Sequence, residues 1–322
     1  MSPATVTRRR FVGQFALAGL GTVLGARHLL GAATAAGSAP LRVVFATDVH
    51  LMQNDALDSA RGLARALDAI EALNPRPDLI LCGGDLTHEL PNLDFPVGEK
   101  LFDRFLEIWR GHTSLPSHFT FGNHDLAGTR FPGVSNEDPR FGKGLFRARL
   151  KLEKSFYSFD AGGWHFVVLD DVAPNSDGSY NGEFADEQLL FLRADLAVAA
   201  GRPTIICGHI PSASIFPTFQ GLAKVADRKI QTPVSLVASN TRALLDVITA
   251  PGAKVKLLLA GHLHHLERME VDGIAFLNGG AICGNWWKGA QAGCPEGFTV
   301  IDLQADGSLA AKYLAYDWKA AG

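Results

Sequence analysis

The sequence predicts an α/β fold, and two observations lead to this expectation. The first is an alternation of apolar, β-branched runs with amphipathic segments. The second is a recurring order in which an apolar run ends, a glycine or short turn follows, and a metal-binding side chain comes next. Open α/β sheets place their sites at the carboxyl ends of strands, where glycine allows a tight turn and a close approach of the backbone. The same pattern therefore predicts both the fold class and the location of a site.

The first part of the chain fits a strand, helix, strand crossover. Residues 41–47 and 78–82 are short apolar runs. Apolar residues recur between these runs at helical spacing, at Ala60, Leu63, Ala64, Leu67 and Ile70. A second amphipathic helix is expected over residues 97–110, followed by a strand over 118–121. This order is typical of a parallel sheet with helical connections.

The second part of the chain continues the alternation of strands and helices and then changes to strands alone. Strands are expected over residues 164–169, 204–207 and 255–260, with a helix over 185–199 that has Leu189, Leu192 and Leu196 on one face. After Leu266 the helical signal fades. A closing set of antiparallel strands is expected over 273–277, 298–303 and 310–314. Two stretches, 128–144 and 211–233, are expected to be long loops over the site, where selectivity usually resides.

Composition favours one catalytic domain over residues 40–322. The chain has 322 residues, of which 47% are hydrophobic and 20% charged, enough to bury a sizeable core. The formal charge is -3, but residues 1–35 hold four arginines and no acid, so the remainder has 26 bases and 33 acids, or -7. An acidic surface argues against a groove that follows the phosphates of a long nucleic acid.

Residues 1–35 are predicted to be a twin-arginine-type signal peptide. Arg8, Arg9 and Arg10 precede a weakly hydrophobic stretch, and residues 33–35 form a small-x-small cleavage pattern. A cytoplasmic tail or an uncleaved anchor is the alternative. Because Arg27 and His28 interrupt the apolar run, we expect export to the periplasm or beyond, with cleavage and no permanent membrane anchor. This route carries folded proteins, which suits a chain that receives metal ions before export.

The four cysteines show no structural zinc pattern. Cys82 and Cys207 end apolar runs, where a buried thiol behaves as a small hydrophobe. Cys283 and Cys294 lie eleven residues apart, and whether they form a disulfide is left open, since sequence does not give their distance.

Five short clusters contain metal-binding side chains. They are Asp48-Val-His50, Gly84-Asp85, Gly122-Asn123-His124-Asp125, Gly208-His209 and Gly261-His262-Leu-His264. Carboxylates mixed with imidazoles and an amide suit Mn, Fe or Zn rather than calcium. The clusters supply enough ligands for two divalent ions, with Asp85 as the bridging carboxylate. Two ions roughly 3.5 to 4 Å apart lower the pKa of a shared water, which produces a hydroxide at neutral pH.

In this order the clusters resemble the calcineurin-like metallophosphoesterase superfamily, with all five blocks between Arg42 and Leu303. The resemblance implies a four-layer α/β/β/α sandwich of two mixed sheets, with a dinuclear metal site at strand ends. It also implies hydrolysis of a phosphate ester by the metal-bridging hydroxide. His124 would stabilise or protonate the leaving oxygen, and Asp125 would orient its imidazole. The first ion would be held by Asp48, His50, Asp85 and His264, and the second by Asp85, Asn123, His209 and His262.

Differences from the motifs of two phosphatase branches of the superfamily narrow the activity expected of this chain. His88 stands where purple acid phosphatases would have tyrosine, and Asp125 stands where protein Ser/Thr phosphatases would have glutamate. Residues 182–196 are similar to bacterial phosphodiesterase-like members, so a small phosphodiester is the favoured substrate. A phosphomonoesterase is the alternative. A non-catalytic metal-binding recognition protein is less favoured, because such a protein would have lost His124 or Asp85.

Several further residues are candidates for substrate contact or for supporting the ligands. His88 is expected to lie close to the chemistry, and Arg130 and Lys288 are candidates for a phosphate oxygen. Trp286 and Trp287 are candidates for stacking on a base, although packing at a sheet edge or the pocket rim is favoured. The identity of the metals and the oligomeric state do not follow from the sequence.

Overall fold

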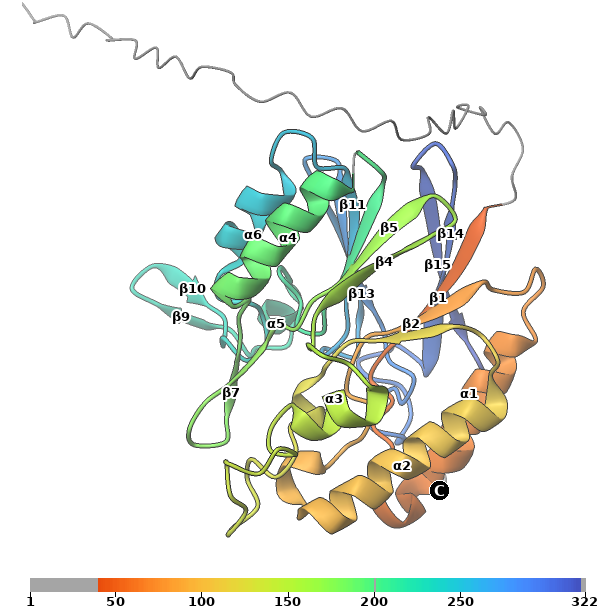
Figure 1. Ribbon diagram of the computed structural model, residues 1–322, viewed down its shortest axis with the longest axis vertical. Coiled ribbons are helices and arrows are strands. Elements are labelled where there is room, and N and C mark those ends of the chain that lie inside the picture. Colours follow the sequence, from red (N-terminus) through yellow and green to blue (C-terminus); the bar gives the residue numbers. More distant parts are fainter. Residues whose placement is uncertain (1–39, 200, 320–322) are drawn as a thin grey trace, which may run out of the picture. The chain divides into compact units, whose positions relative to one another are not determined.

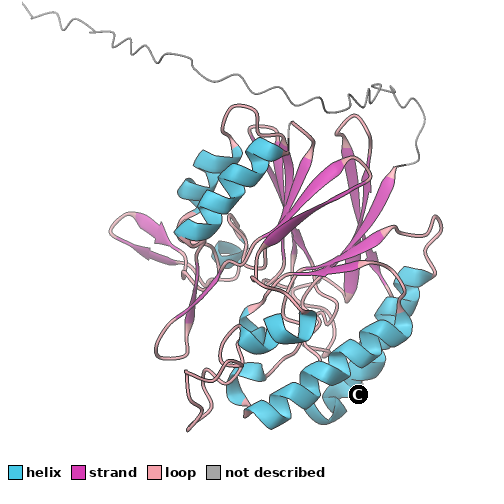
Figure 2. Cartoon of the chain, viewed as in Figure 1, coloured by secondary structure: helices cyan, strands magenta, loops and turns pink. Residues whose placement is uncertain are grey.

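A computed structural model describes residues 40–199 and 201–319. Two mixed β-sheets pack face to face, and helices cover their outer faces (Figure 1 and Figure 2). The expected α/β sandwich is therefore confirmed. The predicted signal peptide lies outside the described residues. Within the described ranges, no helix has the length and apolar character needed to cross a membrane.

The first sheet has the order β15-β14-β1-β2-β3. Its strands are β1 (Leu41–Ala46), β2 (Leu79–Cys82), β3 (Ser117–Phe119), β14 (Gly297–Leu303) and β15 (Leu309–Ala315). β1, β2 and β3 run parallel, whereas β14 pairs antiparallel with both β1 and β15. The segments that follow β1, β2 and β3 therefore leave the sheet at one edge.

Two amphipathic helices, α1 (Ser59–Glu71) and α2 (Phe95–His112), cover the outer face of this sheet. α1 buries Leu63 and Leu67, and α2 buries Phe102 and Phe105. The Asp94 carboxylate accepts a hydrogen bond from the backbone N–H of residue 97 at 2.9 Å, which caps the start of α2. Shorter helices lie nearby, namely η1 (Gln53–Asp58), η2 (Leu90–Asn92), η3 (Asn123–Asp125) and α3 (Gly144–Leu150).

The second sheet has the order β12-β13-β11-β8-β5-β4. Its strands are β4 (Tyr157–Ala161), β5 (Trp164–Val168), β8 (Thr204–Cys207), β11 (Val255–Ala260), β12 (Leu266–Val271) and β13 (Ile274–Gly279). The four central strands run parallel. Helices α4 (Asp186–Val198) and α6 (Thr241–Ile248) cover its outer face. Buried side chains such as Phe45, Phe166 and Leu257 fill the space between the two sheets.

The structure differs from the sequence-based expectation in several segments. Residues 273–277 were expected in an antiparallel set, but β13 pairs parallel with β11 and antiparallel only with β12. Strands β4 and β12 and helix α6 were not among the expected elements.

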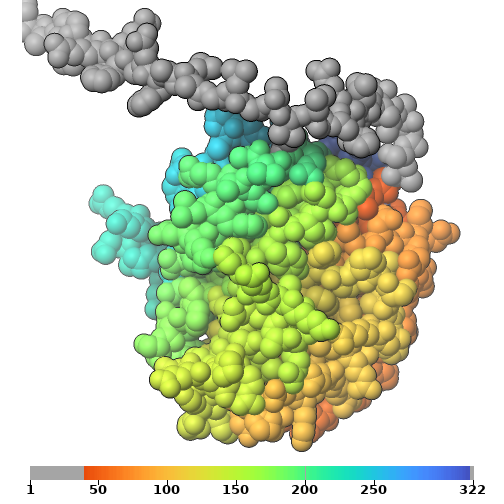
Figure 3. All heavy atoms as spheres, in the orientation of Figure 1, coloured from red at the N-terminus to blue at the C-terminus, as the bar shows by residue number. Residues whose placement is uncertain are grey.

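Residues 211–233 are not a plain loop, because they form α5 (Phe216–Phe219) and a hairpin of β9 (Lys224–Ala226) and β10 (Lys229–Gln231). The hairpin projects from the surface, in blue-green in Figure 3. A second hairpin, of β6 (Val172–Pro174) and β7 (Tyr180–Gly182), was also not anticipated. Strands this short carry too few alternating residues to stand out in the sequence.

Candidate metal centre

The predicted ligands converge where parallel strands of both sheets end. Asp48 and His50 follow β1, Asp85 follows β2, His209 follows β8, and two histidines follow β11. The chain after β1 stays paired with the chain after β2, since Asp48 N donates to Gly84 O at 3.1 Å and His50 N to Asp85 O at 2.9 Å. The structure thus brings together all seven residues predicted as ligands. Their role in binding metal stays a prediction.

The backbone at this centre is held in an unusual conformation. Five of the predicted ligand residues have φ angles between 46° and 69°, namely Asp48, His50, Asp85, His262 and His264. For residues other than glycine this left-handed region costs on the order of 1 to 2 kcal/mol each. The backbone bonds between the two strand ends hold the chain in place. Concentrated strain of this kind is typical of a functional site.

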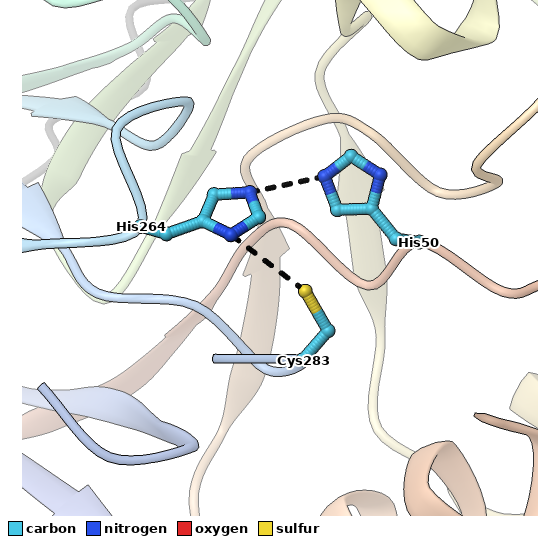
Figure 4. A group of neighbouring side chains, drawn as sticks. All are labelled: His50, His264 and Cys283. Atoms are coloured by element: carbon cyan, nitrogen blue, oxygen red, sulfur yellow. Dashed lines mark hydrogen bonds between the residues drawn. The ribbon is translucent and has the colours of Figure 1, made fainter. Parts of the chain in front are cut away.

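The first half-site consists of Asp48, His50, Asp85 and His264. The Nε2 atoms of His50 and His264 lie 3.0 Å apart, as Figure 4 shows. His264 Nε2 lies 3.3 Å from Asp48 Oδ1, and His50 Nε2 lies 3.3 Å from Asp85 Oδ2. All four side chains are buried. Two imidazole nitrogens and two carboxylates that converge away from water suit a divalent cation.

The second half-site consists of Asp85, Asn123, His209 and His262. His209 Nε2 lies 3.1 Å from Asn123 Oδ1 and 3.3 Å from Asp85 Oδ2. One ligand atom from each of Asp85, His209 and His262 lies within 4.8 Å of the others. Asp85 Oδ2 is therefore 3.3 Å from one imidazole of each half-site. This is the arrangement expected of a carboxylate that bridges two ions.

Backbone carbonyls orient three of the imidazoles. His209 Nδ1 pairs with Gly83 O at 2.8 Å, His264 Nδ1 with Gly284 O at 2.6 Å, and His262 Nε2 with Ser235 O at 2.8 Å. Because a carbonyl only accepts, each of these nitrogens carries a proton, and the other ring nitrogen is the one left for a metal ion. Ligand histidines are commonly fixed by such a bond. The residues present therefore fit a pair of divalent cations.

Burial and neighbouring charges set the protonation of the ligands. Burial lowers the pKa of His50 well below its ordinary value and that of His262 to about 4, so both imidazoles are neutral at pH 7. Burial opposes the ionisation of Asp85, but His209, His124 and His50 outweigh it and hold the pKa of this carboxyl well below its usual range.

Burial also opposes protonation of the other two imidazoles, but Asp85 outweighs it at His209 and raises that pKa to about 10, while Cys283 and Asp48 raise the pKa of His264 well above its ordinary value. The centre therefore offers an ionised bridge and two neutral imidazoles, and metal binding would displace a proton from each of the other two.

His124 lies beside the first half-site. Its ring centroid is 4.6 Å from that of His50, and its ring stacks on His88 at 5.0 Å. His124 Nδ1 pairs with the backbone carbonyl of His88, so Nε2 is the nitrogen left for a substrate. The His88 side chain in turn has Nδ1 at 3.2 Å from His50 Nδ1. His88 thus touches both a predicted ligand and the predicted acid.

The expectation that Asp125 orients the His124 imidazole is wrong. The Asp125 carboxylate instead accepts hydrogen bonds from the backbone N–H groups of Leu86, Thr87 and Gly122 at 3.0 to 3.2 Å. The turn of η3 directs the two neighbouring side chains apart, and the His88 carbonyl takes the orienting role. Asp125 therefore fixes the loops that hold Asp85 and Asn123.

The two tryptophans have different environments. Trp286 is half-buried, with its ring centroid 4.9 Å from that of His264, and its buried indole N–H has no hydrogen-bond partner among the described residues. Trp287 is fully buried and donates from Nε1 to His50 O at 3.0 Å, so it belongs to the core. Packing rather than base stacking is the role of Trp287.

The two cationic candidates for a phosphate contact remain predictions. Arg130 is exposed and donates from Nε to Gly178 O at 2.9 Å, and Lys288 is also exposed.

The cysteines are all free and buried. Cys283 Sγ lies 3.8 Å from His264 Nδ1, as Figure 4 shows, and no bond joins it to Cys294.

Sequence reasoning missed three residues around the centre. Asp171 is buried and accepts from the backbone N–H groups of His209 at 2.9 Å and Ile210 at 3.0 Å, and burial raises its pKa to about 7. Ser235 supplies the carbonyl for His262, and the Tyr180 ring lies 6.1 Å from that histidine. The position of Asp171 shortly after a buried strand was a usable signal. Nothing in the sequence marks Ser235 or Tyr180.

The layered fold and the paired half-sites define an α/β protein with a candidate dinuclear metal centre. Residues 41–266, more than two thirds of the chain, match the family model for calcineurin-like phosphoesterases. The chain therefore belongs to the calcineurin-like phosphoesterase family, which confirms the resemblance seen in the sequence.

Two relatives are similar to this chain in sequence, and one solved structure is similar to it in fold. The chain is 28% identical to a probable cyclic nucleotide phosphodiesterase of Rhodococcus erythropolis, over 75% of this chain and 70% of the relative. It is 23% identical to a 3′,5′-cyclic-nucleotide phosphodiesterase of Nostoc sp., over 85% of this chain and 91% of that protein. The fold is similar to that of GAP50, the anchor in the inner membrane complex of Plasmodium, with a TM-score of 0.52, 15% identity, and coverage of 87% and 86%.

Proposed function

We propose that this phosphoesterase hydrolyses a small phosphodiester at a dinuclear centre formed by the two half-sites. The observation that carries the proposal is the position of Asp85 Oδ2, 3.3 Å from His50 Nε2 and 3.3 Å from His209 Nε2. Two divalent ions held there would supply Lewis acidity and a water of lowered pKa. The names of the two relatives make 3′,5′-cyclic nucleotides the first substrate class to test.

The chain's own residues have separate roles in this proposal. Asp85 links the half-sites, and the three imidazoles bound to backbone carbonyls would bind the ions through their other ring nitrogen. His124 Nδ1 keeps its proton on the His88 carbonyl, so Nε2 faces the substrate. In its doubly protonated form, His124 would transfer the Nε2 proton to the leaving oxygen and become a neutral imidazole. The stacked ring of His88 limits rotation of His124. Asp125 and Asp171 fix the backbone of the ligand loops and take no part in proton transfer.

Substrate preference tests the proposal. The purified protein, reconstituted separately with Mn, Fe and Zn, is assayed with bis-p-nitrophenyl phosphate, p-nitrophenyl phosphate and 3′,5′-cyclic AMP. We expect turnover of the diesters to exceed that of the monoester. A strong preference for p-nitrophenyl phosphate would identify a phosphomonoesterase. Metal uptake without turnover of any ester would favour the non-catalytic alternative.

Replacement of His124 tests its assigned role. The variant His124→Ala should lose about 10²-fold or more in kcat with unchanged metal content, since it removes a proton donor and no ligand. His112→Ala is the matched control, because His112 pairs with Asp68 on the helical face and should keep full activity. An unchanged rate in His124→Ala would show that another group protonates the leaving oxygen.

We propose further that residues 1–35 direct export of the folded protein and that residues 40–322 act as one catalytic domain. The arginines before Phe11 and the small residues at 33–35 support this proposal. Replacing Arg8 and Arg9 with lysine should retain the protein in the cytoplasm. The mature N-terminus, determined by mass spectrometry on the exported protein, should lie just after residue 35. An intact N-terminus on the exported protein would contradict cleavage.

A further inference from the structure

An unusual concentration of apolar side chains is exposed on residues 215–234, here called the arm. Within the described ranges, ten large apolar side chains are exposed, and six of these lie on the arm. They are Ile215, Phe219, Leu222, Val225, Ile230 and Val234. Phe219 is 76% exposed and Val225 is 80% exposed. Scattered exposed apolar residues are ordinary, but a contiguous group of them marks an interaction surface.

The β9–β10 hairpin of the arm has two chemically distinct faces. Val225 pairs across the strands with Ile230, and neighbouring pairs place Lys224 and Lys229 on the opposite face. All six strand residues are exposed. A two-stranded hairpin is at best marginally stable by itself in water. Among the residues that the structure describes, nothing covers the apolar face of the hairpin, so that face lacks the packing partner that a stable hairpin needs.

Helix α4 presents a second unpartnered apolar surface. Its inner face is buried through Leu192 and Leu196. Its outer face carries an exposed apolar stripe at positions i, i+4, i+7 and i+8, formed by Leu190, Ala194, Ala197 and Val198. Leu190 is 68% exposed and Val198 is 77% exposed. This spacing is typical of a buried helix face, so the stripe has the pattern of a contact surface although it faces solvent.

The two surfaces carry opposite charge. The arm has Lys224, Arg228 and Lys229 against Asp227, which gives +2. Residues 183–198 have four acids and one base, which gives -3. Glu187 already pairs with Lys154 at 2.6 Å and Asp195 with His165 at 2.7 Å, so the acids available to the arm are Glu183 and Asp186, at or before the start of α4. Opposite charges beside matching apolar surfaces favour association and fix its orientation. The arm is therefore complementary to α4.

The arm is held in place at its base. Ser214 Oγ donates to Glu267 Oε2 at 2.6 Å, and Ile215 N donates to Glu267 Oε1 at 2.8 Å. At the other end of the arm, the Ser235 carbonyl binds His262. These contacts limit the freedom that the arm would lose on binding, which favours association.

We propose that the arm of one copy of this chain packs on α4 of a second copy, in a two-fold symmetric dimer. The β9–β10 hairpin and α4 both lie on the left of Figure 1, with the hairpin projecting beyond the helix. Because the interface is two-fold, each arm-to-helix contact occurs twice, which helps a small patch approach the ~800 Å² per partner of a stable interface. Pairing of two arms with each other is disfavoured, since it would bring six basic side chains together.

The mass of the purified protein in solution, measured by sedimentation from about 1 to 100 µM, is the first test. We expect twice the mass of one chain at the upper end. The apolar variant Val225→Ser with Ile230→Ser should raise the dimer dissociation constant at least tenfold. A wild-type protein that stays monomeric throughout would overturn the proposal, and binding to phosphatidylglycerol vesicles by that monomer would identify a lipid surface as the occupant of the arm.

Charge reversal tests which surfaces meet. Lys224→Glu with Lys229→Glu on the arm should weaken the dimer, as should Glu183→Lys with Asp186→Lys at or before the start of α4. The four changes combined should restore most of the affinity, because the charges again oppose. Lys312→Glu, an exposed residue of β15, is the matched control and should leave the dimer unchanged. A dimer that the arm reversal leaves intact or strengthens, or one that the combined reversal fails to restore, would refute the arm-to-helix contact. Circular dichroism checks that each variant is folded.

Discussion

Replacing Gly62 with alanine is expected to destabilise the protein, although alanine is the better helix former. Gly62 lies inside α1, where that helix packs on the Trp287 indole. A Cβ at this position would lie 2.2 Å from the nearest ring carbon of Trp287. The indole has little room to retreat, because it is fully buried, its N–H is bonded to His50 O, and the Trp318 ring lies 5.6 Å away by centroid. Helix α1 or the ring must therefore shift.

The two opposing contributions differ in size. Exchanging glycine for alanine inside a helix gains about 1 kcal/mol in helix propensity. Carbon atoms pack best at about 3.5 to 4.0 Å, so relieving the contact requires a movement of more than about 1 Å. Overpacking in a dense core usually costs about 1 to 3 kcal/mol, and this site lies at or beyond the upper end. We expect a net loss of about 2 kcal/mol or more. The first half-site should also be weaker, because Trp287 donates to the His50 carbonyl.

Gly111 provides the matched control, since a Cβ there meets no other atom within 4 Å in the last turns of α2. Gly111→Ala should leave stability unchanged or raise it by less than about 1 kcal/mol. Urea unfolding of both variants, in chelator and then with Mn, measures the free energy of unfolding and the binding of metal. Equal stabilisation by the two substitutions would refute the packing argument.

Three further outcomes follow from contacts described above. Burial lowers the pKa of His118, which stacks on Phe159, from 6.5 to about 4, so in that window the unfolded chain binds a proton that the native chain does not. The contribution of His118 to the free energy of unfolding of the chelated protein should therefore fall as pH drops from 6.5 towards 4, by less than about 1.4 kcal/mol per unit. The difference between wild type and His118→Phe isolates this contribution, because other buried groups such as Asp171, whose pKa is raised, are common to both proteins. Asp171→Asn leaves one of two buried N–H groups without an acceptor, so it should weaken metal binding at the second half-site about tenfold or more. Calorimetric titration with Mn would measure this affinity. An unchanged affinity would contradict the supporting role assigned to Asp171. Removal of metal should lower the midpoint of thermal unfolding, and adding Mn to about 100 times its dissociation constant should restore about 2.7 kcal/mol of the free energy of unfolding. A midpoint that does not change with chelator would mean that the half-sites bind no ion.

The sequence allowed the strand-end positions of the ligands to be predicted because one local rule repeats at each. Asp48, Asp85 and His209 each follow a buried parallel strand, and parallel strands end at the same edge. The same reasoning failed for the hairpin within residues 211–233, where each strand has only three residues and no buried face. Periodicity arises from one-sided burial, so an element exposed on all sides carries little of it.

Adjacency in sequence was a poor guide to contacts between side chains. Asp125 follows His124 directly, but the turn directs its carboxylate to backbone amides. Conversely, His88 is remote in sequence from His124 and yet stacks on it. The sequence did not decide whether Cys283 and Cys294 form a disulfide, because a spacing of eleven residues in a glycine-rich segment fits both a short and a long distance between the two thiols. Such questions depend on turn geometry, which residue type alone constrains weakly.

The rings of His209, His262 and His264 are steadied by main-chain oxygens. An amino-acid substitution changes a side chain, but it does not remove the backbone carbonyl oxygen at that position. Single substitutions at residues 83, 235 and 284 therefore cannot delete these acceptors, and they disturb ring orientation only by displacing the loop. We expect this centre to be most sensitive to insertions, deletions and substitutions by proline, because these changes alter the path of the backbone.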